Sequence, residues 1–152
     1  MQSYANRPRC NRLKRIIALH KFKRDSIKKL VKRLNETCET LDKNYNTNWG
    51  GCCYVAYVLA EKLSELKIDY EVGIDGVFNI DESNNITIVF ISHIAIRVNN
   101  KYIINDMPNS SLSYDWYNLR SDQLWDMYVK GDWNTHYDPC YNTIVKNEIL
   151  NL

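Results

Sequence analysis

Residues 50–74 read GGCCYVAYVLAEKLSELKIDYEVGI, and this stretch decides the fold. Two glycines are followed by apolar residues four positions apart, Val55, Leu59 and Leu63, which is the spacing of one face of an α-helix. We therefore expect a helix over residues 52–66. The residues that follow it are β-branched and aromatic, so the periodicity changes from that of a helix to that of a strand.

The chain downstream of this helix predicts a sheet. Short runs of β-branched and aromatic residues alternate there with turn residues. Helices followed by strands are typical of an α+β fold with an antiparallel sheet. The expected strand runs are residues 69–74, 76–80, 86–91, 93–98 and 101–106.

The chain upstream predicts two further helices, which we expect to pack on this sheet. Pro8 is suited to the first turn of one helix, which would run to about His20. Asp25 is a good N-cap for the second, whose apolar residues recur at helical spacing between residues 27 and 41. Beyond the strands, Ser121 is expected to cap a short helix over residues 122–130.

The length of 152 residues suits one domain, but its charge is unevenly distributed. Residues 1–33 hold twelve Lys and Arg against one acid, a net +11. Residues 34–152 hold eight against seventeen, a net −9, and the two sum to the formal +2 of the chain. We divide the chain into a basic N-terminal arm or pair of helices, 1–33, and a body, 34–152. The arm suggests contact with an acidic partner or nucleic acid, and the alternative is a solvated face or an arm folded onto its own acidic body.

The composition argues against several classes of protein. No apolar run approaches the roughly 20 residues that span a bilayer, and the N-terminus is too charged for a secretory signal. The five cysteines are odd in number and lack the spacing of a disulfide framework, so we expect reduced thiols and a cytoplasmic protein. Adjacent cysteines chelate poorly, so we expect no metal and no cofactor. The Asn-, Lys- and Ile-rich composition fits an AT-rich genome, such as that of a phage.

Cys52 is the candidate nucleophile. It opens the expected helix, where unsatisfied backbone N–H groups and the helix dipole favour a thiolate, so we expect a lowered pKa. Gly51 allows a sharp turn and leaves room for a substrate, and Trp49 could wall the pocket. The backbone N–H of Cys52 is a natural oxyanion donor, and Asn46 or Asn48 could supply a second.

A hairpin supplies the candidate base and its orienting group. Asn99-Asn100 is a plausible two-residue turn, since Asn tolerates positive φ. Paired positions would then sum to 199, which places His93 opposite Asp106 with Cβ atoms about 5 Å apart. A carboxylate there fixes the tautomer of the imidazole and stabilises the imidazolium. A cysteine at a helix start with a histidine backed by an aspartate suits nucleophilic attack on an acyl carbon.

Residues 50–74 resemble the nucleophile helix of papain-like and transglutaminase-like cysteine enzymes, in which Gly-x-Cys or Gly-Gly-x-Cys opens a helix. HIAIRVNNKYIIND, residues 93–106, resembles the His strand, hairpin and Asp strand of that superfamily. The resemblance covers about residues 46–110. It implies a papain/transglutaminase-like catalytic domain in which Cys52, His93 and Asp106 form the triad.

The implied activity is that of a peptidase, deamidase or acyl transferase acting on a peptide or protein amide. Cys53 is the alternative nucleophile, at the cost of a helix register shifted by one. A further alternative keeps the fold without turnover, as a binding or structural module whose basic segment docks on an acidic partner or nucleic acid.

Overall fold

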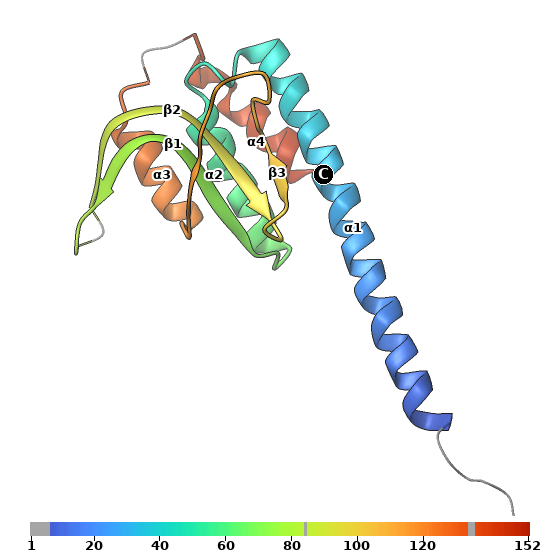
Figure 1. Ribbon diagram of the computed structural model, residues 1–152. Helices are drawn as coiled ribbons and strands as arrows, with labels where there is room; N and C mark the ends of the chain where they lie inside the picture. The colour runs from blue at the N-terminus through green and yellow to red at the C-terminus, as the bar shows by residue number, and fades with distance from the viewer. Residues whose placement is uncertain (1–6, 84, 134–135) are drawn as a thin grey trace, which may run out of the picture.

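The computed structural model describes residues 7–83, 85–133 and 136–152, with side chains from residue 12 onward. The chain mixes helices with an antiparallel sheet, which confirms the α+β class (Figure 1). The helices are α1 (Arg7–Tyr45), α2 (Cys52–Glu65), α3 (Ser121–Lys130), the short 3-10 helix η1 (Pro139–Tyr141) and α4 (Asn142–Leu150). The strands are β1 (Tyr70–Ile80), β2 (Ile86–Val98), β3 (Tyr102–Ile104) and β4 (Asp115–Tyr117).

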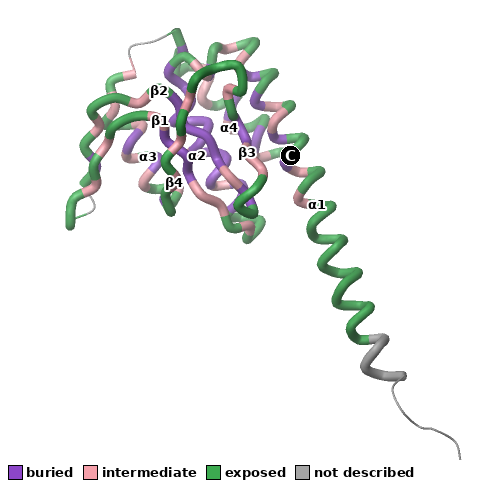
Figure 2. Tube along the Cα trace, in the orientation of Figure 1, coloured by how far each residue is buried: buried purple, intermediate pink, exposed green. Residues whose placement is uncertain are grey.

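The sheet has the strand order β3-β2-β1-β4, and helices cover one of its faces (Figure 1). Helix α2 packs against β2 and β1, with α3 and α4 beside it. Ten of its residues are buried, so α2 is the centre of the core (Figure 2). The expected helices at Cys52 and Ser121 are thus confirmed. The four strand runs between residues 69 and 98 form two long strands, interrupted by register shifts.

Helix α1 is one continuous helix, so the expectation of two N-terminal helices with a cap at Asp25 was wrong. Its residues 11–45 contain no proline or glycine, and Lys, Arg, Leu and Glu are strong helix formers, so nothing interrupts it at Asp25. It ends where Asn46 takes a φ of 55°, a usual left-handed helix terminus. Residues 12–26 are exposed and project from the body, whereas the later part packs against β3 and α4 (Figures 1 and 2). Asn99 of the hairpin lines one hollow together with residues between Ile17 and Ile27.

The hairpin between β2 and β3 has a register that differs from the expected one. Asn99 and Asn100 both take a φ of 54°, as expected, but Lys101 also belongs to the loop. Val98 therefore pairs with Tyr102, and paired positions sum to 200 instead of 199. The expected pairing of His93 with Asp106 is wrong, since β3 ends at Ile104 and His93 pairs with Asp75 of β1.

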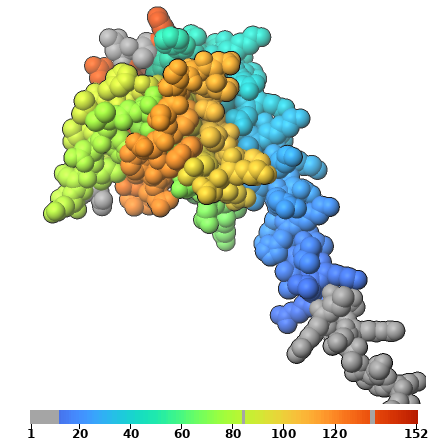
Figure 3. Space-filling view, in the orientation of Figure 1, coloured from blue at the N-terminus to red at the C-terminus, as the bar shows by residue number. Residues whose placement is uncertain are grey.

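The chain from β3 to β4 crosses the other face of the sheet, because these two strands lie at opposite edges (Figure 3). Trp116 closes over Gly73, where an added Cβ would lie 2.6 Å from its ring. Arg97 stacks on the same ring at 4.1 Å and pairs with Glu71 at 2.7 Å. His93 lies on this covered face, with its ring 6.4 Å from that of Tyr114.

None of the helices in the described ranges combines the length and the hydrophobicity that crossing a bilayer requires.

Candidate active site

Cys52 is the first residue of α2, and a tight loop delivers the chain to it. Gly50 takes a φ of 112°, and Gly51 is the N-cap without a side-chain hydrogen bond. Thr47 is buried beneath the loop. The sequence therefore places the thiol at the amino end of a buried helix, as expected.

The environment of the Cys52 sulfur contains two opposing influences. Burial raises the pKa of this thiol to about 11, while hydrogen bonds from the backbone N–H groups of Ile94, Cys53 and Cys52 itself lower it. The helix start thus acts in the expected direction, but desolvation is larger because only 2% of Cys52 is exposed. The expectation of a lowered pKa was wrong for this state of the protein, in which the group is a neutral thiol.

His93 is held as a neutral imidazole with one free lone pair. Its Nε2–H donates to the carbonyl oxygen of Asn105 at 2.5 Å. A carbonyl only accepts, so the proton lies on Nε2 and the neutral ring keeps an acceptor at Nδ1. Nδ1 is buried and has no hydrogen-bond partner within the described residues.

The charge state of His93 follows from its burial. Desolvation lowers the pKa of the ring, while the Asn105 carbonyl, and after it the carboxylates of Asp106, Asp42 and Asp75, raise it. The net direction is downward, so the ring is neutral at pH 7. Several carboxylates nevertheless lie near enough to stabilise an imidazolium if one forms.

The sulfur of Cys52 lies near the strand that carries His93. The backbone of Ile94, the residue after His93, is among the groups that lower the pKa of Cys52. Ile94 pairs with Ile74, and both are buried in the core. Neighbouring side chains of a strand alternate between the two faces of the sheet, so the side chain of His93 lies on the face opposite α2. Among the described residues, no hydrogen bond joins His93 Nδ1 to the sulfur of Cys52.

Asp106 lies near His93, but Asn105 makes the direct contact with the ring. The Asp106 carboxylate is exposed and accepts from the Met107 N–H and the Tyr114 hydroxyl, both at 2.8 Å. Asn105 takes a φ of 61°, which turns its carbonyl toward His93. The group that contacts the His93 ring is thus the backbone carbonyl of Asn105, and not the carboxylate of Asp106 as expected.

Asn35 of α1 fixes Asn105 in this position. Its Oδ1 accepts the Asn105 N–H at 3.0 Å, and its Nδ2 donates to the Ile103 carbonyl at 3.0 Å. Asn105 Nδ2 in turn lies 3.5 Å from the Ile94 carbonyl. The packed part of α1 therefore positions the histidine through one intermediate residue. Sequence patterns could not identify these two residues, because Asn35 is 70 residues before Asn105, and Asn105 is 12 residues after His93.

The loop residues expected to form the pocket have different positions. Asn46 is exposed at the end of α1, and Trp49 is 58% exposed, with its ring edge-on to His136 at 6.0 Å. Asn48 is half-buried, and its backbone N–H donates to Asp42 at 2.7 Å. Of these three, Asn48 alone turns a polar side-chain atom inward.

Three buried side-chain atoms in the described residues have no hydrogen-bond partner: Thr47 Oγ1, Asn48 Oδ1 and His93 Nδ1. Native proteins satisfy most buried polar atoms, so such groups require an explanation. Two belong to the loop before Cys52 and the third to the candidate base. A hollow of about 180 Å³ adjoins this region, lined by Asn35, Cys38, Glu39, Asp42, Lys43, Asn48, Asn105 and Asp106.

Tyr137 covers the helix start. Its backbone N–H donates to the Trp49 carbonyl at 3.1 Å. A Cβ added to Gly51 would lie 2.8 Å from its ring, so only glycine admits this close approach. The hydroxyl of Tyr137 donates to the Asn142 side chain, which ties the cover to the start of α4. Tyr137 therefore packs directly over Gly51, the residue before Cys52.

Cys53 differs from its neighbour although both are buried. Its thiol lies 3.4 Å from the Leu124 carbonyl of α3 and donates to it. Burial raises the pKa of Cys53 well above its usual value, and the nearby Cys52 raises it further. This contact points into the helix layer, so Cys53 packs α2 against α3.

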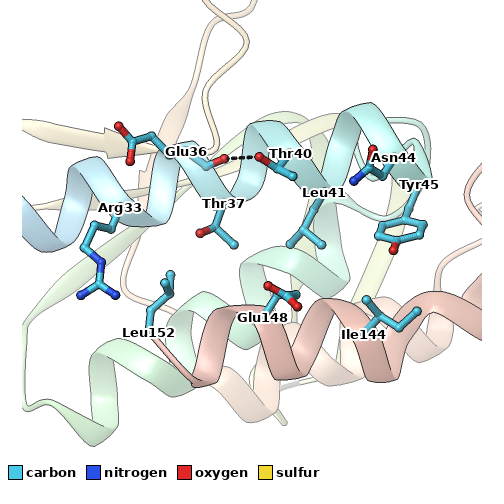
Figure 4. A pocket seen from close by; sticks show the side chains of 10 residues that line it. All are labelled: Arg33, Glu36, Thr37, Thr40, Leu41, Asn44, Tyr45, Ile144, Glu148 and Leu152. Atoms are coloured by element: carbon cyan, nitrogen blue, oxygen red, sulfur yellow. Dashed lines mark hydrogen bonds between the residues drawn. The ribbon is translucent and has the colours of Figure 1, made fainter.

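A second hollow, of about 410 Å³, lies between α1 and α4 (Figure 4). Arg33 and Leu152 stand at one end of it, and Tyr45 and Ile144 at the other (Figure 4). Its lining contains neither cysteine nor histidine, so it offers no thiol nucleophile or imidazole base. No group of three or more metal-ligating side chains is found among the described residues.

Comparisons of this chain with protein-family models, with curated proteins and with solved structures found no match. The connection to the papain-like and transglutaminase-like enzymes therefore remains a resemblance in residues 46–110.

Proposed function

We propose that this protein is a cysteine-nucleophile enzyme that attacks an amide or another acyl carbon, with Cys52 as the nucleophile and His93 as the base. The observation that carries the proposal is that the two groups adjoin neighbouring residues of β2. The backbone of Ile94 is among the groups that lower the pKa of Cys52, and the preceding residue, His93, holds a buried Nδ1 without a hydrogen-bond partner among the described residues. In the proposed reaction the ring of His93 turns from the face of the sheet opposite α2 to reach the sulfur.

The raised pKa of Cys52 and the lowered pKa of His93 imply a neutral resting pair. In the proposed reaction His93 Nδ1 takes the thiol proton while the sulfur bonds to the acyl carbon. The C–N bond then breaks, and the proton passes to the leaving amine. Water or a second amine, deprotonated by His93, releases the acyl group and regenerates the thiol.

The surroundings of the site suit these steps. The Asn105 carbonyl holds the Nε2 proton, and so keeps Nδ1 as the acceptor. The Asp106, Asp42 and Asp75 carboxylates favour the imidazolium that forms. The N–H groups at the start of α2 are the proposed donors to the oxyanion. Asn48 can join them only through its Nδ2, because its buried Oδ1 is an acceptor. Cys52 is 2% exposed, so in the proposed reaction the site must open before a substrate reaches the sulfur.

The experiment is profiling of the full chain by mass spectrometry with an acyl-directed cysteine probe at pH 7. We expect labelling that disappears in Cys52→Ala and persists in Cys53→Ala, which is the matched control because both thiols are buried on α2. His93→Gln should also abolish labelling, because glutamine is not a base. Its side-chain amide can still donate to the Asn105 carbonyl, so the fold should be kept. Circular dichroism checks the fold of each variant. Labelling that is uniformly slow, or that survives in His93→Gln, contradicts the proposal.

A structural role for Cys52 is the second candidate, and its near-complete burial favours it. Free cysteine commonly behaves as a small apolar core residue. The chain would then be a catalytically inactive binding or structural module. This candidate expects no labelling at Cys52 under native conditions, and a similar loss of stability in Cys52→Ala and Cys53→Ala.

A further inference from the structure

The free part of α1, residues 12–26, is a cationic rod. All of its described residues are exposed, and it projects away from the body as the blue helix of Figures 1 and 3. Between residues 12 and 33, ten Lys and Arg face a single acid, Asp25, a net +9. Of these ten, Lys32 pairs with Glu36 of the same helix at 3.8 Å. Such a density of one charge attracts a polyanion.

The cations surround the helix instead of occupying one side of it. At about 100° per residue, Arg12, Lys14, Arg15, Lys21, Lys23 and Arg24 point in directions spread around the whole circumference. The exposed apolar residues are divided as well. Phe22 is 69% exposed and lies nine residues after Leu13, so the two point about 180° apart.

This distribution favours one class of polyanion. A helix that lies on an anionic membrane separates its apolar and cationic faces, and a helix on a flat protein surface uses one side only. The major groove of B-form DNA, about 12 Å wide, admits an α-helix and presents phosphates on both flanks. Residues 12–26 extend for about 22 Å at 1.5 Å per residue, which is enough to lie along the groove.

We infer that residues 12–26 of α1 bind duplex DNA by insertion into the major groove, with the cations on both flanks neutralising phosphates. The acidic body, net −9 over residues 34–152, stays outside the groove because the free helix holds it at a distance. The inference does not depend on the activity of Cys52, so Cys52→Ala should bind DNA as the unaltered chain does.

Binding of the full chain to a short fluorescent duplex, measured by anisotropy between about 50 and 200 mM salt, tests the inference. The affinity should fall steeply with salt, by a slope of about 0.9 in log–log terms for each phosphate neutralised. Lys21→Gln with Lys23→Gln should reduce that slope by about 1.8. The matched control is Lys67→Gln with Lys101→Gln, which removes two exposed lysines from the body and should leave the slope unchanged.

Binding partners of residues 12–26 other than duplex DNA would give different results in these experiments. Equal slopes for the two double variants would overturn the inference. So would tighter binding to phosphatidylserine vesicles than to the duplex, which would assign the helix to a membrane surface. A dimer in sedimentation velocity that Lys21→Gln with Lys23→Gln disperses would assign it to a second copy of the chain.

Discussion

The free part of α1, residues 12–26, and its packed part, residues 27–45, belong to one helix but differ in burial and in contacts. In the packed part, Leu34 is fully buried and Cys38 and Leu41 are nearly so. In the free part, Leu13 and Phe22 are 59% and 69% exposed, although residues of the same kind are buried further along the helix. The packed part also holds the candidate site through Asn35. The comparison shows that tertiary partners, and not helix pattern alone, decide where this helix contributes stability.

The largest expected effect separates the two parts directly. Leu34→Ala should destabilise the protein by about 2–5 kcal/mol, because it leaves a cavity in the core between α1 and the body. Leu13→Ala, the matched change in the free part, should alter the free energy of unfolding by less than about 0.5 kcal/mol. Urea unfolding measures both. Similar losses for the two variants would mean that the free part is also packed in solution.

The next effect concerns the link from α1 to the site. Asn35→Ala removes two hydrogen bonds and leaves the Asn105 N–H and the Ile103 carbonyl without those partners, at a cost of about 1–3 kcal/mol. The pKa of His93, followed by NMR, should shift as Asn105 loses its fixed position. Asn44→Ala, an exposed change on the same helix, is the control. An unchanged His93 titration in Asn35→Ala would show that Asn105 is held by other contacts.

A smaller effect comes from a buried thiol of the packed part. Burial raises the pKa of Cys38 from 9.0 to about 12. Below pH 9 the thiol is protonated in both the folded and the unfolded state, so the free energy of unfolding is not reduced by Cys38 there. As the pH rises above 9 the unfolded state loses its proton first, so stability should fall by on the order of 1 kcal/mol by pH 10. Urea unfolding at pH 8 and 10 measures this loss of stability. The loss should be smaller in Cys38→Ala. An identical loss in the variant would show that Cys38 does not titrate in this way.

The smallest effect is expected at Phe22. Phe22→Ala should change the free energy of unfolding by less than about 0.5 kcal/mol, because this exposed ring contributes nothing to the core. The same ring-to-methyl change at a buried aromatic costs about 3–5 kcal/mol. Thermal unfolding in dilute salt provides the measurement. A loss of more than about 1 kcal/mol would indicate that Phe22 packs against another surface of the protein.

Much of the fold could be predicted from local patterns. The helix at Cys52 followed from its four-residue apolar spacing. The short helix α3 was also expected, but its N-cap is Arg120 and not Ser121. The break at Asp25 was wrong because a good N-cap residue does not end a run of strong helix formers. The hairpin register was missed by one residue, since two asparagines with positive φ do not reveal that Lys101 joins the loop.

The candidate site was less predictable, because tertiary contacts control its chemistry. The helix start favours thiolate and is visible in the sequence, but the larger desolvation of Cys52 depends on elements far along the chain. The contact of Asn105 with His93 depends on a turn at Asn105 and on Asn35 of α1. Asp106 was assigned from a register that the structure corrects, and its proposed role is now electrostatic.

The cover that Tyr137 places over the start of α2 has a consequence for biosynthesis. A ribosome completes residue 52 roughly 85 residues before residue 137, an interval of about 4–17 s at ~5–20 residues per second. Throughout that interval the nascent chain lacks the segment that covers Gly51. The start of α2 is therefore uncovered in the nascent chain before Tyr137 can close over Gly51, and oxidants and electrophiles meet it there without this cover.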